Sequence, residues 1–260
     1  NWTSGFTQMK PFSGKKPSKK TLVAMLHDQE AIYFGVKCFD NPDSLSRVLS
    51  LRDDYNPNLD FFGIFIDTYN DKQNGFYFGI SSRGVQSDAK IFSEEFNDLL
   101  NLVWRSKTKI NDQGWFAEIK IPYSALRFPN EEIQSWNINF ARQISRFREE
   151  NTWSPVNPDL ENFLLESGVV LGIKDITPPI RLAFIPFLSS YTSFSKNSKT
   201  LSNINGGLDV KYGVNEAFTL DVTLLPDFGQ VIFDQQVLNI SPFEIRFNEN
   251  RQFFTEGTEL

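Results

Sequence analysis

Short runs of β-favouring residues, each bounded by turn-forming residues, recur along the first two-thirds of this 260-residue chain. Two such runs, at 21–28 and 31–40, are separated only by Gln29 and Glu30, and an Asn-Pro-Asp-Ser turn follows the second. Closely spaced apolar runs with turn residues between them are typical of antiparallel hairpins. The sequence therefore predicts an all-β protein built from antiparallel sheets.

The aromatic content supports this fold class. The chain has 26 Phe, 7 Tyr and 5 Trp against 2 Met, and aromatic rings fit the half-buried surfaces of strands. Runs at 60–69 and 75–84 predict a further hairpin, with Asn74-Gly75 as a turn signal. Only 90–104 has the three- and four-residue apolar spacing that indicates a helix. We therefore expect an antiparallel β-sandwich over 1–172.

The pattern of apolar, polar and proline residues changes after this region. Consecutive prolines make 173–179 the predicted linker, because they stiffen a chain and stop a strand. Residues 180–260 are expected to form amphipathic β-strands, interrupted by a polar loop at 195–205. In 217–229 apolar and polar residues alternate, which suits either a half-buried sheet or the strands of a membrane barrel.

Charge and composition exclude several classes of protein. The net charge of −6 argues against a nucleic-acid-binding protein. No stretch is apolar over the roughly 18 to 20 residues that a membrane helix needs. Cys38 is the only cysteine and His27 the only histidine, so neither an intramolecular disulfide nor a cysteine-based zinc site can form.

An acidic stretch offers a candidate metal site at Asp67 and Asp71. Carboxylates gathered on loops suit hard cations such as Ca²⁺. The EF-hand pattern fails here, because Lys72 and Phe78 stand where it needs glycine and glutamate. Ordinary turn-forming aspartates are the alternative interpretation, and a structural calcium ion stays a hypothesis. The stretch contains Asp53, Asp54, Asp60, Asp67 and Asp71.

Exposed tryptophans are the usual platforms for stacking sugars, because the C–H faces of a pyranose pack on rings. Most of the five are expected in the core. Trp153 is the favoured exception, since charged residues able to bind a polyol surround it. Arginine–glutamate pairs at a sheet edge would give the same pattern. The predicted ligand-binding residues are Trp104, Trp153, Arg142, Arg146 and Glu150.

A catalytic site is not predicted. Glycoside hydrolysis needs two carboxylates facing each other across a cleft, and Glu149 and Glu150 would diverge on a strand. Nucleophile elbows, phosphate loops and metalloprotease helices are absent from the sequence. We therefore expect a non-catalytic protein.

Several long segments resemble the family 9 carbohydrate-binding-like domain, in the form found at the N-terminus of large outer-membrane-associated proteins of Bacteroidetes. They include "GVKCFDNPDSLSRVLSLRDD", "DFFGIFIDTYNDKQNGFYFGISSRGVQSD", "GWFAEIKIPYSALRF" and "WNINFARQISRFREENTWSP". The segment from "GGLDVKYGV" to "NRQFFTEG" is similar to the entrance of the domain of unknown function with barrel-type strands that follows the sandwich in those proteins. The resemblance thus implies a sandwich followed by the start of an outer-membrane-type barrel that continues beyond Leu260.

The same resemblance implies a function. Sugar-binding members of the family hold a sugar between two Trp rings and carry calcium, and Trp104 and Trp153 are the only pair that could match here. The first hypothesis is a non-catalytic, glycan-binding or glycan-binding-derived module in the periplasm or at the cell surface. The alternative is a protein-interaction or plug subunit that docks on an outer-membrane channel or secretion translocon. A glycoside-hydrolase-associated enzyme comes third. Membrane association would come from a barrel region or a partner rather than from a transmembrane helix.

Overall fold

The computed structural model describes residues 1–224 except 47, 55, 93–94, 98–101, 160–162, 181, 196–197 and 215–217. The chain divides into two compact units, Asn1–Pro179 and Ile180–Leu260. Each unit is described by itself below. All the strand pairings are antiparallel, so the predicted all-β fold class is confirmed.

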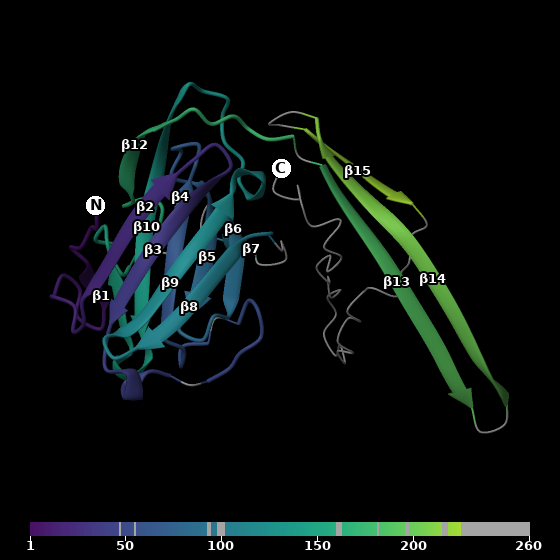
Figure 1. Cartoon of the computed structure of the whole chain (residues 1–260), viewed down its shortest axis with the longest axis horizontal. Helices are drawn as coiled ribbons and strands as arrows, with labels where there is room; N and C mark the ends of the chain where they lie inside the picture. Colours follow the sequence, from purple (N-terminus) through teal and green to yellow (C-terminus); the bar gives the residue numbers. More distant parts are fainter. Residues whose placement is uncertain are drawn as a thin grey trace, which may run out of the picture. The chain divides into compact units, whose positions relative to one another are not determined.

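The first unit is a sandwich of two sheets, here called sheet A and sheet B (Figure 1). Sheet A has four strands in the order β2 (Thr21–His27), β3 (Ala31–Phe39), β9 (Gly114–Pro122) and β8 (Arg105–Asn111). Sheet B runs through β1 (Thr7–Lys10), β11 (Glu149–Thr152), β10 (Ile133–Ile144), β4 (Phe61–Asp67), β5 (Asn74–Ser81), β6 (Gln86–Phe92) and β7 (Glu95–Asn97), and β12 (Gly168–Lys174) also pairs with β10. Single turns of 3₁₀ helix lie at Pro42–Ser44, Tyr123–Ala125 and Ser145–Phe147.

The core lies between the two sheets and consists of the inward-pointing residues of their strands. On β3 buried residues alternate with half-buried ones from Ile32 to Phe39, which is the two-residue period of a strand with one covered face. Aromatic rings fill much of the space, as in the stacked pair Phe62 and Phe140, whose centroids are 6.0 Å apart. Cys38 is completely buried, and burial raises the pKa of its thiol to about 11. It therefore acts as a small apolar core residue.

The helix predicted within 90–104 is wrong for the described residues. Strand β6 ends at Phe92 and β7 begins at Glu95, so the chain reverses and Ile91 pairs with Phe96. The helical spacing was misleading because apolar residues on both arms of a tight hairpin also recur at intervals of three to five. Pairing with β5 decides the conformation, which is a tertiary effect on a weak local preference.

The hairpin predicted between 60–69 and 75–84 is confirmed, but its turn lies elsewhere. Asn74 and Gly75 already belong to β5, where they pair with Phe92 and Ile91. The reversal is made before them, by residues that include Asn70 at φ 56° and Lys72 at φ 59°. Both conformations are left-handed, and side-chain hydrogen bonds from aspartates stabilise this turn, as described below.

The second unit contains three antiparallel strands, here called sheet C: β13 (Leu182–Ser195), β14 (Ser198–Gly213) and β15 (Thr219–Leu224). The polar loop expected at 195–205 is therefore wrong, because β14 extends the hairpin through most of it. Residues opposite one another across the strands share a face, and one face of sheet C is mostly apolar, with Ser190 and Thr192 on it toward the β13–β14 turn. This apolar face consists of Leu182, Phe184, Pro186, Leu188, Ile204, Leu208, Val210, Tyr212, Leu220, Val222 and Leu224.

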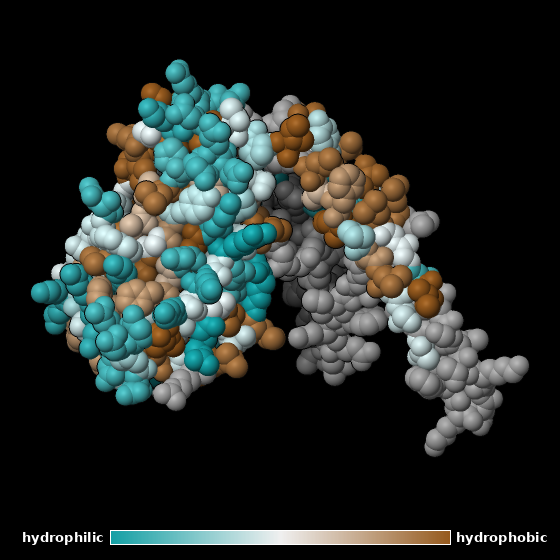
Figure 2. Space-filling model, in the orientation of Figure 1, coloured by the Kyte–Doolittle hydropathy of each residue, from teal (hydrophilic) through white to brown (hydrophobic). Residues whose placement is uncertain are grey.

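The other face of sheet C carries polar groups. Lys211 and Asp221 lie opposite one another and form an ion pair of 3.7 Å, with Asp209 next to them along β14. On the apolar face, by contrast, Leu188 is 80% exposed and Phe184 61% exposed. Figure 2 shows hydrophobic side chains gathered over the described part of this sheet. The predicted amphipathic strands are thus present. The barrel-type continuation lies outside the described residues.

The described residues include no helix with the length and hydrophobicity that a bilayer crossing requires.

Candidate functional site

Arg142, one of the predicted ligand-binding residues, is not available to a ligand. It projects from β10 into the space between the sheets and is 2% exposed. Its guanidinium donates to the carbonyl oxygens of Lys20 and Phe39 and to the hydroxyl of Thr21, at 2.9 to 3.0 Å. Thr21 begins β2, Lys20 directly precedes it and Phe39 ends β3, so Arg142 ties sheet B to sheet A.

Arg146 belongs to the same structural cluster. Its guanidinium binds both carboxylate oxygens of Asp40, at 2.8 and 2.5 Å, and Arg142 lies 3.6 Å from the same carboxylate. Burial alone would raise the pKa of Asp40. The hydrogen bonds from Arg146 and the N–H of Asn41, together with the charge of Arg142, outweigh burial and hold the pKa below its ordinary value.

Glu149 and Glu150 point to different partners, as expected of neighbours on a strand. Glu149 is buried and accepts a hydrogen bond from the N–H of Ser18 at 2.9 Å. Glu150 is partly exposed and forms an ion pair with Lys10 at 3.5 Å. They do not face each other across a common cleft.

The two predicted tryptophans are not brought together around a ligand. Trp104 is 5% exposed, packs edge-on against Phe78 of β5 and donates its indole N–H to Asp88 at 3.0 Å. Trp153 is half-buried, packs against Phe140 of β10 and donates to Thr3 Oγ1 at 3.1 Å. Strand β4 lies between β5 and β10, so the two tryptophan rings pack against different strands of sheet B.

Asp67 and Asp71 act as turn-forming residues. Asp67 is buried and accepts hydrogen bonds from the N–H groups of Tyr69 and Lys72 and from the Asn137 amide. Asp71 accepts from Gln73 and twice from Asn74. Burial raises the pKa of Asp71, but those hydrogen bonds outweigh burial and hold the pKa below its ordinary value.

These contacts use the oxygens that a calcium ion would need. Nowhere in the described part of the chain do three or more His, Cys, Asp or Glu side chains gather as metal ligands. The residues present at this turn therefore do not fit a bound calcium ion.

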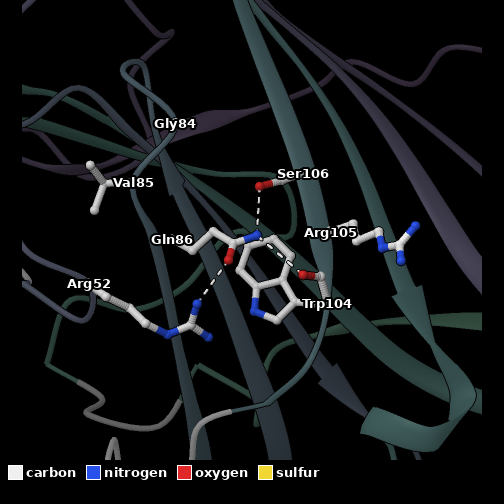
Figure 3. Close-up of a pocket in the computed structure, with 7 residues that line it drawn as sticks. All are labelled: Arg52, Gly84, Val85, Gln86, Trp104, Arg105 and Ser106. Atoms are coloured by element: carbon white, nitrogen blue, oxygen red, sulfur yellow. Dashed lines mark hydrogen bonds between the residues drawn. The ribbon is translucent and has the colours of Figure 1, made fainter.

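An open pocket of about 600 Å³ lies where β6 meets the start of β8 (Figure 3). Its polar groups bind one another: the Gln86 amide donates to Ser106 Oγ at 2.8 Å and accepts from Arg52 at 2.9 Å. Arg105, which also lines the pocket, points away from Gln86. The pocket lies between the two sheets, and the side chains of Gln86, Ser106 and Arg52 within it are bound to one another.

The most exposed tryptophan is instead Trp2, which sequence analysis placed in no site. It is 46% exposed, whereas Trp115 and Trp136 are fully buried. Thr3 pairs with Val23 at the edge of β2, and this pairing brings the N-terminal segment alongside sheet A. The indole rests on the backbone of Gly35, where an added Cβ would lie 3.3 Å from its Cη2 atom.

Small residues make room for this ring. Gly35 of β3 pairs with Ala24 of β2, so no bulky side chain rises from the sheet beneath the indole. Lys37, two positions along β3, places its Nζ 4.1 Å from the centre of the Trp2 ring. The ring therefore contacts sheet A through the outer atoms of its six-membered ring, and the Lys37 ammonium makes a cation–π contact with it.

Trp2 lies on the side of sheet A that points away from the core, here called the outer face. The outward residues of β3 from Tyr33 to Phe39 are all half-buried, as are Phe116 and Lys120 of β9. Phe39 and Phe116 form an edge-to-face pair with centroids 6.3 Å apart. From Gly35 to Phe39 the strand advances roughly 13 Å at about 3.3 Å per residue. Aromatic rings are thus spread over more than the width of one pyranose ring.

Polar groups frame these rings. The Tyr33 hydroxyl donates to Asp28 at 2.8 Å, and Lys120 lies 3.5 Å from Glu30. The hydrogen bond with Tyr33 raises the pKa of Lys120 above its ordinary value. Glu118 is exposed at the centre of the face, between Gly35 on one side and Lys107 on the other. In Figure 2 the sandwich is viewed from this side, with hydrophilic and paler side chains intermixed.

A local signal for Trp2 exists, though it is weak. The short segment "NWTSG" offers few apolar neighbours for a core strand, and Gly35 interrupts an otherwise bulky β-run. A glycine inside a strand often marks the close approach of another group. Their contact could not be predicted, because it depends on the pairing of Thr3 with β2.

Comparison with known proteins supports the fold. The chain is similar to a candidate carbohydrate-binding protein from Bacteroides uniformis, with 12% identity and a TM-score of 0.50 over 64% of this chain and 85% of that one. It is also similar to a family 9 carbohydrate-binding module from Caldicellulosiruptor kristjanssonii solved with cellotriose, with 14% identity, a TM-score of 0.46 and coverage of 66% and 84%. A family 9 module from the same organism solved with glucose has 14% identity and a TM-score of 0.47, with 69% of this chain and 88% of that one covered.

Among curated proteins no match was found. The expected resemblance of the last segment is confirmed. The chain thus shares its sandwich fold with the Bacteroides uniformis protein, and residues 178–260 match the family described as Domain of unknown function (DUF5916).

Proposed function

We propose that the first unit is a non-catalytic carbohydrate-binding module and that Trp2 is its sugar platform. The observation that carries the proposal is the exposed indole, which contacts Gly35 of sheet A and has the Lys37 ammonium beside its ring. The C–H face of a pyranose can pack on this exposed ring once the flexible Lys37 side chain moves off it. Glu118, Lys37 and Lys120 stand around it to hydrogen-bond hydroxyl groups. The shared fold with a candidate carbohydrate-binding protein supports the same function.

The test is a glycan array followed by calorimetric titration of the full chain with the oligosaccharides that bind. Trp2→Ala is expected to lower the affinity by about tenfold, since a stacking ring contributes about 1 to 2 kcal/mol. Gly35→Val should have a similar effect, because its side chain would lift the indole from the sheet.

Phe12→Ala is the matched control. Phe12 is also an exposed aromatic residue beneath a lysine, with Lys15 3.8 Å from its ring centre, but it lies in the loop after β1. Its loss should leave the affinity unchanged. If the array shows no ligand, or if Trp2→Ala binds as well as the wild type, the proposal fails.

A second role is favoured by the apolar face of sheet C. An apolar surface that extends over three strands is unusual for a protein that faces water on all sides. We propose that this face attaches the protein to the cell envelope, at the periplasmic side of the outer membrane, by docking against an outer-membrane channel protein. The ion pair of Lys211 and Asp221 lies on the opposite face and would then remain hydrated.

Cell fractionation tests this second role. Leu188→Asp should move the full chain from the outer-membrane fraction to the soluble periplasmic fraction, because a charge in an apolar contact is costly. Ser189→Asp places the same charge on the opposite face and serves as the control. Equal distribution of both variants and the wild type would refute the docking role.

A further inference from the structure

The outer face is strongly basic in a protein that is acidic as a whole. The four strands of sheet A contain five Lys or Arg residues and one acidic residue, a net charge of 5 − 1 = +4, whereas the whole chain carries −6. All six point outward, as the pairing register and the burial alternation require. They are Lys37, Arg105, Lys107, Lys109, Glu118 and Lys120.

Three of these cations lie on the edge strand β8. Arg105, Lys107 and Lys109 are exposed and occupy alternate positions, so their side chains leave the strand roughly 6.6 Å apart. Within the described residues none of the three forms an ion pair. Lys120, by comparison, is partly neutralised by Glu30.

The register places one pair of like charges opposite one another, whereas Lys107 lies opposite Glu118. Arg105 of β8 pairs directly with Lys120 of β9, an arrangement that destabilises an antiparallel pair. A bound anion would remove this repulsion. Lys109 pairs with Phe116, so a cation and an aromatic ring also stand side by side where a ligand could contact both.

We infer that the outer face binds an acidic polysaccharide, whose sugar rings pack on Trp2 and Phe116 while its carboxylate or sulfate groups reach the cations of β8. This inference rests on the proposed carbohydrate-binding function and adds the charge class of the ligand. Cations repeated along an extended strand suit a polymer with repeated anionic groups. Glu118 at the centre of the face can accept hydrogen bonds from sugar hydroxyls, and the anionic groups of the ligand would lie away from it, toward the edge strand β8.

The experiment compares acidic polymers with matched neutral ones, using the full chain. The two pairs are polygalacturonate with its methyl ester, and dextran sulfate with dextran; they distinguish carboxylate from sulfate. We expect at least one acidic polymer to bind about tenfold more tightly than its neutral counterpart, with an affinity that falls as NaCl is raised. Single-stranded DNA is titrated in parallel.

The double variant Lys107→Gln, Lys109→Gln should weaken binding of the acidic polymer by about tenfold and leave any binding of the neutral one unchanged. Both residues are exposed on an edge strand, so the thermal midpoint should not move. Lys15→Gln, Lys16→Gln makes the same charge change in the loop after β1 and is the control.

Each outcome bears on a different claim. Equal affinity for acidic and neutral polymers, or no effect of the β8 variant, overturns the acidic-ligand inference, and the proposed function survives if Trp2→Ala still weakens binding. Tighter binding of single-stranded DNA than of either acidic polymer also overturns the inference. If no glycan binds at all, the proposed function fails and this inference fails with it.

Discussion

At the scale of single residues, side chains of the same type have different roles because their surroundings differ. Trp2 and Trp104 both have polar neighbours in the sequence. Trp2 is 46% exposed, whereas Trp104 is 5% exposed and donates its N–H to Asp88. Arg142 and Arg105 differ in the same way. The buried guanidinium holds two sheets together, whereas the exposed one is free to meet a ligand.

The buried carboxylate of Asp40 provides a stability test with a defined pH dependence. Asp40→Asn should lower the free energy of unfolding at neutral pH by about 3 kcal/mol, because it leaves Arg142 and Arg146 near a neutral group. Since the pKa of folded Asp40 lies below its ordinary value of 3.8, the stabilisation is complete above about pH 4 and is lost as the pH falls further.

Urea unfolding at neutral and at acid pH measures this effect. The difference between wild type and variant should narrow below about pH 4. Asp112→Asn, in the exposed turn between β8 and β9, is the control and should change little at any pH. A constant difference across the whole range would contradict the proposed role of the ion pairs.

At the scale of elements, the β4–β5 turn depends on hydrogen bonds within the turn, whereas the β6–β7 hairpin depends on pairing with another strand. Both hairpins bring together strands that follow each other in the sequence. In the first, aspartate side chains replace the hydrogen bonds that a tight Asn-Gly turn would have made. In the second, pairing with β5 overrides a helical spacing.

The turn between β4 and β5 gives a prediction about metal. Asp67→Ala should lower the free energy of unfolding by about 3 kcal/mol, since it leaves two backbone N–H groups and the Asn137 amide without their acceptor. The wild type should melt at the same temperature with and without excess EGTA, because these oxygens already accept protein hydrogen bonds. A lower melting temperature in EGTA would instead support the calcium hypothesis.

At the scale of the whole molecule, the two units bury their side chains in different ways. Among the residues that the structure describes, every member of the two hydrophobic core clusters belongs to the first unit. Sheet C has one strongly exposed apolar face among its described residues. The sandwich therefore has a core of its own, whereas the described part of sheet C leaves an apolar face exposed.

Truncation after Pro179 tests this division. The fragment 1–179 should unfold cooperatively, with the same midpoint as the corresponding transition of the full chain, because the described core clusters consist of first-unit residues. It should also keep the same affinity for the oligosaccharides found by the array. A fragment that aggregates or melts much earlier would show that the second unit stabilises the sandwich.

Much of the fold could be predicted from the sequence, because hairpins and alternation are local. The strands at 21–27 and 31–39, the strand that ends at Pro122 with a turn of 3₁₀ helix after it, and the amphipathic strands after residue 180 all follow from patterns a few residues long. These patterns depend on the period of a strand and on turn chemistry, neither of which requires knowledge of distant partners.

The site could not be predicted in the same way. Which tryptophan stays exposed depends on the pairing of Thr3 with Val23 and on Gly35 beneath the indole, and these residues are distant in sequence. The role of Arg142 was likewise decided by acceptors on β2 and β3. The sequence by itself determined an antiparallel all-β chain with an amphipathic end, since periodicity is local. Only the tertiary structure decided which charges and rings face solvent, because exposure depends on which sheet covers which face.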